Sequence, residues 1–201
     1  MELALSICLG IGLSAACGFR VFVPLLGMSI AAFAGHLDLS EGFDWIGTWP
    51  AFACFLTATI LEVVAYYIPW VDNLLDSVAT PVAVVAGTVV TAAVVTDMSP
   101  LMKWSLALIA GGGTAGIIQS ASVALRGTSS LATGGLTNWG VASAELLASI
   151  TTTILSVVVP ILTAIGVAVL IVMMLTFVRR QLRRPNTTSN VTVPLESSRS
   201  V

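Results

Sequence analysis

The feature that most constrains the fold is a run of 40 largely apolar residues, from Trp139 to Val178. A helix of that length would measure about 60 Å, which is twice the thickness of the hydrocarbon core of a bilayer. The run therefore predicts two membrane-spanning helices. Pro160 is the residue at which we expect them to divide at a tight turn, because proline interrupts a helix.

Charged residues are scarce except at the C-terminal end. They make up 9% of the 201 residues, against about 25% in an ordinary soluble domain. Residues 1–178 hold only twelve of them. This composition excludes a soluble enzyme, a nucleic-acid binder, a disulfide scaffold and a disordered chain. The single histidine, His36, and three cysteines without metal-ligand spacing indicate no cofactor. We expect a polytopic membrane protein whose partner is the lipid bilayer and not a nucleic acid.

Further apolar segments precede this run. The first, Leu3–Ala34, is too long for one straight span and is interrupted at Gly18 and Arg20. The others are expected to cross the membrane once each: Ala51–Tyr67, Pro81–Thr96 and Trp104–Leu125. Polar loops are expected at Gly35–Thr48, Asp72–Thr80 and Arg126–Asn138, and an interfacial aromatic belt at Tyr66, Tyr67 and Trp70. The predicted fold is an all-α transmembrane helix bundle of five or six spans.

The chain matches itself at a fixed offset. Eight residues between Gly12 and Gly35 recur 100 positions later, and four between Trp49 and Ile60 recur 90 positions later. A duplication would give two three-span repeats, 1–98 and 99–178, of which the second enters the membrane inverted, as in many secondary transporters. The alternative is a shared small-residue packing pattern. Gly and Ala faces of this kind also make a homo-oligomer an option.

Basic residues predict the orientation. Four arginines follow the last span: Arg179, Arg180, Arg183 and Arg184. Lys and Arg flanks stay in the cytoplasm, so six spans place both termini there. Residues 179–201 are expected to form a polar, disordered cytoplasmic tail.

Two charges lie deep inside the predicted spans. Glu62 is near the middle of the second span, where a carboxylate is costly and usually marks a substrate, ion or proton site. Arg20 in the first span reaches a similar depth. We therefore predict an Arg20–Glu62 pair that binds an anionic group or couples to protons. A purely structural ion pair is the alternative.

The second half repeats this pattern near the inner face. Arg126 ends the fourth span and Glu145 begins the fifth, so both are further candidates for substrate binding or proton coupling. The simpler role for Glu145 is a carboxylate that meets the positive end of its helix dipole. Asp72 and Asp76 stand four residues apart, on one face if their segment is helical. They are a weak candidate for a divalent metal site, since such pairs are more often simply solvated.

Two motifs resemble a known family. One is the pattern Glu-x6-Pro-x2-Asp-x3-Asp from Glu62 to Asp76, and the other is Thr133–Asn138 followed by Ser143 and Glu145. Over roughly residues 5–175 the chain resembles the bacterial inner-membrane family catalogued as domain of unknown function 4126. The resemblance implies a protein integral to the inner membrane and draws attention to the acidic positions. It implies no activity.

The function expected from these patterns is secondary transport of a small polar or anionic solute, or of a lipid head group, with proton coupling as one option. Arg20 would contact the anion and Glu62 would carry the proton. One alternative is a membrane scaffold or accessory protein that transports nothing. A second is an intramembrane lipid-modifying enzyme that uses Asp72 and Asp76. We expect transport or assembly rather than catalysis.

Overall fold

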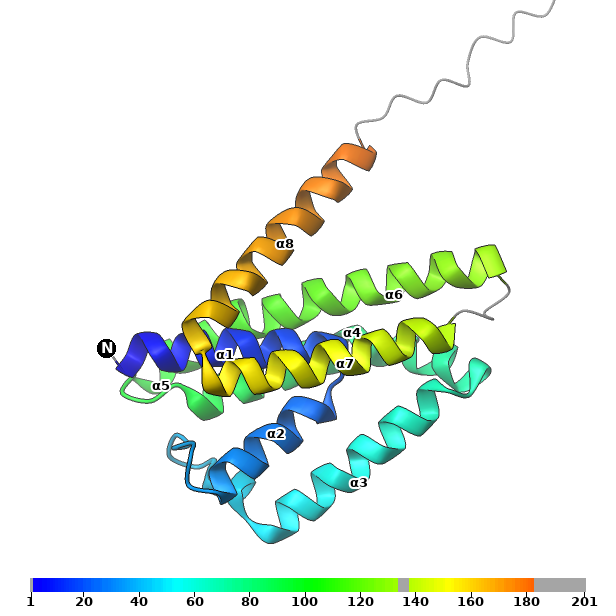
Figure 1. Ribbon diagram of the computed structural model, residues 1–201. Coiled ribbons are helices and arrows are strands. Elements are labelled where there is room, and N and C mark those ends of the chain that lie inside the picture. The colour runs from blue at the N-terminus through cyan, green and yellow to red at the C-terminus, as the bar shows by residue number, and fades with distance from the viewer. Residues whose placement is uncertain (1, 134–137, 183–201) are drawn as a thin grey trace, which may run out of the picture.

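The computed structural model describes residues 2–133 and 138–182, and all its regular elements are helices (Figure 1). The predicted tail lies outside these residues from position 183 onward. In chain order the elements are α1 (Glu2–Phe19), α2 (Phe22–Phe33), the 3₁₀ turn η1 (Asp44–Gly47), α3 (Trp49–Tyr66), α4 (Pro69–Val94), α5 (Pro100–Leu106), the π-helical turn η2 (Ala107–Gly112), α6 (Gly113–Thr133), α7 (Asn138–Val158) and α8 (Pro160–Leu182). The predicted all-α class is confirmed.

Prolines begin several of the helices. Pro69, Pro100 and Pro160 each occupy the first position of a helix, and Pro50 the second position of α3. Proline suits these positions because its missing N–H would have no partner within the first turn. The division of the long apolar run at Pro160 is therefore confirmed, since α7 ends at Val158 and α8 begins two residues later.

The first apolar segment is a broken helix, as Gly18 and Arg20 predicted. Helix α1 ends at Phe19, α2 begins at Phe22, and the chain changes direction between them (Figure 1). The N–H of Arg20 still bonds to the carbonyl of Ala16 at 3.0 Å. The break therefore frees the first N–H groups of α2, and these need partners within the protein.

Two of the expected loops are wrong. Residues Asp72–Thr80 belong to α4, which starts at Pro69, and α6 continues past Arg126 to Thr133. Asn138, the last residue of the predicted Arg126–Asn138 loop, begins α7, and residues 134–137 lie outside the described residues. Polar residues here belong to helices because their side chains bond to one another across the bundle. Both aspartates and Arg126 are consequently fixed on rigid elements.

Small residues let α1 run through the middle of the bundle, where it packs against α4, α6, α7 and α8. Helices α4 and η2 approach closely at Gly87, where an added Cβ would lie 2.9 Å from the carbonyl oxygen of Gly111. Hydroxyl groups join α1 to α4: Ser14 donates to the carbonyl of Gly87 at 2.8 Å and bonds to the hydroxyl of Thr91 at 2.7 Å. Such contacts are typical of helices that associate in lipid.

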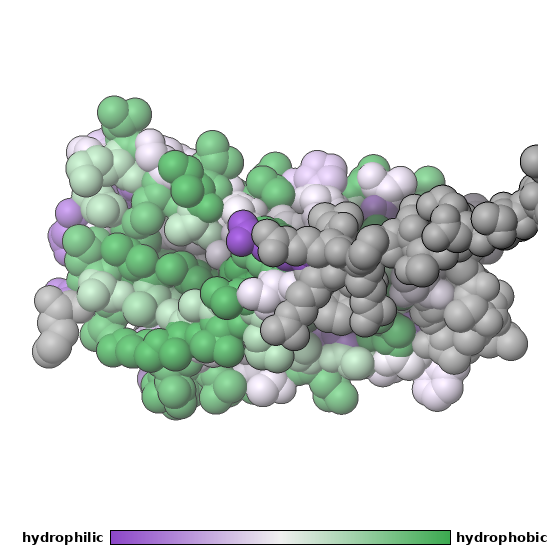
Figure 2. Space-filling model, turned by 90° about the horizontal axis from the view of Figure 1, so that it is seen from above, coloured by the Kyte–Doolittle hydropathy of each residue, from purple (hydrophilic) through white to green (hydrophobic). Residues whose placement is uncertain are grey.

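Many large apolar side chains are exposed, and green covers much of the described part of the face seen in Figure 2. Five helical segments are long and apolar enough to cross a membrane: Glu2–Phe19, Trp49–Tyr66, Leu74–Val94, Pro100–Thr128 and Asn138–Val158. Phe22–Phe33 and Pro160–Thr176 are shorter apolar helices. Helix α8 projects away from the other helices (Figure 1). The protein is therefore a membrane protein built on transmembrane helices.

Candidate functional site

Arg126 is the centre of a buried ionic cluster near the start of α4. From α6, its Nη1 donates to Oδ1 of Asp72 at 3.0 Å and to Oδ1 of Asp76 at 2.7 Å. Its Nε donates to Oε1 of Glu145 at 3.1 Å, and its Nη2 donates to Oε2 of the same carboxylate. Only 1% of the Arg126 surface is exposed. One guanidinium therefore ties α6 to α4 and α7.

Asp72 and Asp76 reach the same arginine because they lie one turn apart on α4. Asn138, at the start of α7, also donates from Nδ2 to Oδ2 of Asp72 at 3.2 Å. The cation between the two aspartates is thus a guanidinium. Residues 2–133 and 138–182 contain no cluster of three or more His, Cys, Asp or Glu that could hold a metal ion. A divalent metal at Asp72 and Asp76 stays a prediction.

Arg20 joins this cluster from the break between α1 and α2. Its Nη2 donates to the carbonyl of Ala142 at 2.9 Å and lies 3.5 Å from Oε2 of Glu145. Glu145 therefore lies between two arginines, and its expected role at the helix dipole is replaced by ion pairs. Arg20 is only 2% exposed, yet its Nε and Nη1 have no hydrogen-bond partner. A buried charged donor without a partner is costly.

The ring of Tyr66 lies beside both guanidinium groups. The Cζ atom of Arg20 is 3.7 Å from the ring centroid, and the Cζ atom of Arg126 is 4.3 Å from it. Cation–π attraction of this kind is worth about 2 kcal/mol or more where water is excluded. Tyr66 is 6% exposed, so its expected place in the interfacial belt is wrong, whereas Trp70 is 74% exposed. Sequence reasoning missed this role, because the adjacent aromatics suggested a belt.

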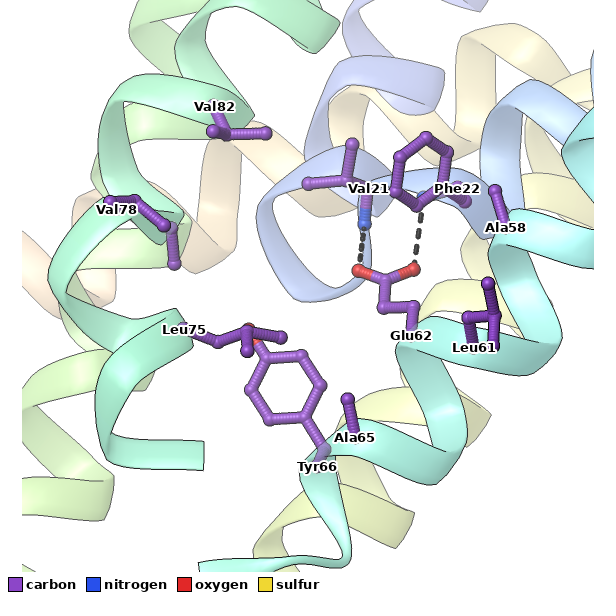
Figure 3. Close-up of a pocket in the computed structure, with 11 residues that line it drawn as sticks. Val21, Phe22, Ala58, Leu61, Glu62, Ala65, Tyr66, Leu75, Val78 and Val82 are labelled. Atoms are coloured by element: carbon purple, nitrogen blue, oxygen red, sulfur yellow. Dashed lines mark hydrogen bonds between the residues drawn. The ribbon is translucent and has the colours of Figure 1, made fainter. Parts of the chain in front are cut away.

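Glu62 binds the backbone at the helix break instead of an arginine side chain. Its Oε1 accepts the N–H of Val21 at 2.8 Å, and its Oε2 accepts the N–H of Phe22 at 3.0 Å (Figure 3). These N–H groups have no partner within α2, so a carboxylate from α3 caps α2 and meets the positive end of its dipole. The side chain is nearly buried, with 8% of the residue exposed.

The structure thus changes the predicted pairing. Arg20 binds Glu145, and Glu62 binds the backbone of α2, in place of the expected Arg20–Glu62 pair. The two sets of candidates, one from each half of the chain, meet in a single region, because Glu145 contacts both Arg20 and Arg126. Whether these residues bind a substrate or protons stays a prediction.

An apolar cavity of about 430 Å³ opens beside Glu62. Its lining comes from the helix break and from α3 and α4, and the stretch of α4 from Leu75 to Val82 forms the wall opposite Glu62 and Tyr66 (Figure 3). The polar groups at its wall are therefore a capped carboxylate and the tyrosine that contacts both arginines. A ligand in this cavity would lie beside the cluster.

Comparison with known proteins gives a family and no activity. No curated protein and no solved structure matches the chain. A family model described as a domain of unknown function, DUF4126, matches residues 7–180. This range covers the helices from α1 into α8 and contains every residue of the ionic cluster. The chain therefore belongs to the DUF4126 family.

Proposed function

We propose that the protein is a secondary transporter of a small polar or anionic solute, or of a lipid head group, and that it couples this movement to protons. Arg20 contacts the anionic group of the substrate, and Glu62 carries the proton. Glu145 holds Arg20 in place and is itself bound by Arg126, so both residues belong to the same site.

The imbalance of buried charge carries this proposal. Two arginines, Arg20 and Arg126, pair with three carboxylates, Asp72, Asp76 and Glu145. A fourth carboxylate, Glu62, is buried on the backbone N–H groups at the helix break and pairs with neither arginine. A cluster that served only to hold helices together would be most stable with balanced charge, because an uncompensated buried charge is costly. An excess of carboxylates instead favours the uptake of further positive charge. A proton supplies that charge most simply.

The broken helix supports the same proposal. Transporters commonly form their sites where a membrane helix is interrupted, because free backbone groups and helix ends then point into the protein. Here the interruption between Phe19 and Phe22 leaves two N–H groups, next to Arg20 in the chain, without partners inside their own helix. Glu62 binds those N–H groups, so protonation of its carboxylate would weaken two hydrogen bonds at the break.

The proposal includes an inverted repeat and an orientation. The recurrence of eight residues between Gly12 and Gly35 at positions 100 residues later supports the repeat. Two halves of this kind would form two gates around one site. The four arginines between positions 179 and 184, of which the first two lie in the last turn of α8, favour a cytoplasmic C-terminus in the bacterial inner membrane.

Transport is tested with purified protein in liposomes that enclose a pH-sensitive dye. Gradients of inorganic phosphate, short carboxylates and zwitterionic amino acids are imposed in turn, and movement of fluorescent phospholipids between leaflets is followed separately. We expect one substrate class to move, and a moving solute to change the internal pH, above the rate in empty liposomes. Absence of movement for the whole panel would overturn the proposal.

Variants in the same assay test whether Glu62 carries the proton and whether Arg20 contacts the substrate. Glu62→Gln should abolish the pH change, because the amide carries no exchangeable charge. Arg20→Gln should raise the substrate concentration needed for half-maximal rate. Glu41→Gln is the matched control, because Glu41 is exposed outside the regular helices and should leave transport unchanged. Equal proton movement in Glu62→Gln and in the wild type would remove Glu62 from the mechanism.

One observation favours the second candidate, a membrane scaffold or accessory protein. Helix α8 projects from the bundle (Figure 1). Many of its large apolar side chains are exposed, among them Ile161, Leu162, Val172 and Met173. Small residues also face outward, since a Cβ added at Gly140 or Gly166 would meet no atom within 4 Å. A scaffold would copurify as a homo-oligomer or with a partner and would show no solute movement. The lipid-modifying enzyme gains no such support, because Asp72 and Asp76 are both bound to Arg126.

A further inference from the structure

We infer that α8 is a hinged lateral gate. Its C-terminal half swings from the projecting position in the structure onto α6, where it fills two cavities and covers the one that Glu145 lines. The role of Glu145 in the site is taken from the proposed function, whereas the movement of α8 does not depend on transport.

Helix α8 packs on the bundle through its first two turns. Thr163 and Val167 are both buried. A Cβ added at Gly12 of α1 would lie 3.1 Å from Cγ2 of Thr163, and Val167 belongs to an apolar cluster with Ile118 of α6. After Val167 most of the large apolar side chains are exposed, among them Leu170, Val172, Met173 and Leu175. The first half of α8 is therefore fixed, and the second half is held much less firmly.

The chain can bend at two points near the packed turns. Val159 belongs to neither α7 nor α8, and Pro160 has no N–H with which to continue the hydrogen bonds of α7. Gly166 lies inside α8, and a Cβ added there would meet nothing within 4 Å. Glycine weakens a helix by about 1 kcal/mol relative to alanine. The second half of α8 can therefore move while the first half stays on α1.

Two cavities lie beside the second half of α8. The larger, of about 660 Å³, is lined by α4, η2, α6 and α8, and the smaller, of about 440 Å³, by α1, α6, α7 and α8. Met174 of α8 and Ala121 of α6 line both, and Glu145 lines the smaller one. The wall of the larger cavity contains a row of small residues four apart: Gly112, Gly116, Ser120 and Ala124. Such a row lets another helix approach closely.

The second half of α8 itself is the occupant that fits these cavities. Ile171 packs against the cluster that contains Val167 and Ile118. Met174, three residues later, already lines both cavities. The interface of α8 with α6 therefore continues directly into them. The two helices also run in the same general direction, so closure lays one along the other (Figure 1).

The length of α8 explains why closure is favoured in a bilayer. Its apolar part, Pro160–Thr176, is about 26 Å long, slightly less than a hydrocarbon core of about 30 Å. In the structure α8 diverges from α6 and α7 (Figure 1), and a divergent helix covers less of that thickness. Alignment with α6 reduces the mismatch. Mismatch costs only fractions of a kcal/mol per Å, so both positions of α8 stay populated.

Closure changes access to one carboxylate and not to the other. In the projecting position, the smaller cavity gives Glu145 an opening beside α8. Once Met174 and the turn that follows it enter this space, that opening is filled. Glu62 lines a different cavity, to which α8 contributes no residue. The gate therefore acts on Glu145 and leaves Glu62 unaffected.

Cysteine cross-linking of the full chain in liposomes tests the movement. The background combines Cys8→Ser with Cys54→Ser and keeps the buried Cys17. Intramolecular bridges are separated from bridges between copies by electrophoresis without reductant, and free thiols are counted by alkylation and mass spectrometry.

The test pair is Leu125→Cys with Val178→Cys. These positions lie four residues after Ala121 and Met174, the two residues that line both cavities. Closure should bring their Cα atoms within the distance of about 7 Å that a disulfide allows. We expect both thiols to be lost to alkylation within the monomer after mild oxidation. Leu61→Cys with Val178→Cys is the control and should keep its thiols, since Leu61 is an exposed leucine like Leu125 but lies on α3.

Filling the cavities should prevent the bridge. Ala121→Trp places an indole at the α6 residue that lines both cavities, so we expect the two thiols to stay free. Gly127→Trp is the matched control on α6, because Gly127 lines neither cavity and a Cβ added there would meet nothing within 4 Å. This variant should leave the bridge unchanged.

Covalent modification tests the gate. Dicyclohexylcarbodiimide is an apolar reagent that modifies carboxyl groups within membranes, and mass spectrometry identifies the residues modified. The bridge should abolish modification of Glu145, and reduction of the bridge should restore it. Modification of Glu62 should be the same with and without the bridge, because its cavity does not involve α8.

Each outcome decides one part of the inference. Free thiols in the test pair, or a bridge that persists in Ala121→Trp, would overturn the movement. A bridge between two monomers would also overturn it, because a second copy would then occupy the cavities. Equal modification of Glu145 with and without the bridge, including none in either form, would overturn the gate.

The gate and the proposed transport fail separately. A bridge that protects Glu145 in a protein that moves no solute would keep the gate and overturn transport. Solute movement in liposomes by a protein that forms no bridge would keep transport and overturn the gate.

Discussion

Replacing Arg126 with glutamine is the most severe single change that the structure allows in the ionic cluster. The variant removes the only guanidinium in contact with Asp72 and Asp76 among the described residues, and one of the two in contact with Glu145. Removing one partner of a buried pair typically costs about 3–5 kcal/mol, because it leaves an uncompensated charge. Since three carboxylates depend on Arg126, we expect the loss in the free energy of unfolding to lie at the upper end of that range.

The loss can be measured by reversible unfolding in mixed micelles, with far-ultraviolet circular dichroism as the signal. Arg126→Lys should recover part of the loss, because it restores the charge but not the forked contacts with Glu145. Lys103→Gln is the control, since Lys103 makes a half-buried hydrogen bond to Ser40 at 2.8 Å and should lose about 1 kcal/mol. A loss below about 1 kcal/mol for Arg126→Gln would refute the reasoning, since that is no more than one ordinary hydrogen bond contributes.

The same assay tests three other contacts. Gly87→Ala should lose about 1–3 kcal/mol, because the added Cβ would lie 2.6 Å from the Cβ of Ala115. Gly166→Ala, which meets nothing within 4 Å, should lose nothing and gain up to about 1 kcal/mol of helix propensity. Tyr66→Leu should lose about 2 kcal/mol or more with its two cation–π contacts, whereas Trp70→Leu, on an exposed side chain, should change stability by less than about 0.5 kcal/mol. Ser14→Ala should lose about 0.6–1.7 kcal/mol, the range for hydrogen bonds between membrane helices. Each contact would be contradicted if its variant had the same free energy of unfolding as its reference. The references are Gly166→Ala for Gly87→Ala, Trp70→Leu for Tyr66→Leu, and the wild type for Ser14→Ala.

Hydropathy and proline position predicted the main divisions of the fold. The break at Arg20 and the division at Pro160 follow from rules that act within a few residues, so a single sequence contains them. The sequence did not predict where α4 begins or where α6 ends. Asp72 and Asp76 resemble a loop by polarity, and their helix is favoured by a partner more than 40 residues away, Arg126.

The candidate residues could be found, but their partners could not. Burial of a charge in an apolar segment is visible in the sequence, and it selected Arg20, Glu62, Arg126 and Glu145. Spacing along a helix gives depth in the membrane but not which neighbour a side chain faces. The contact of Arg20 with Glu145 depends on α7 packing against α1, which no local pattern encodes.

The central claim is that the buried carboxylate of Glu62 exchanges protons with water and is not a sealed structural contact. Infrared difference spectroscopy of the protein in nanodiscs, taken on moving from alkaline to acidic buffer, measures this at individual carboxyl groups. We predict a protonated-carboxyl band that shifts in D₂O and that is missing from the Glu62→Gln variant. Difference spectra that are identical for the wild type and Glu62→Gln would contradict the claim.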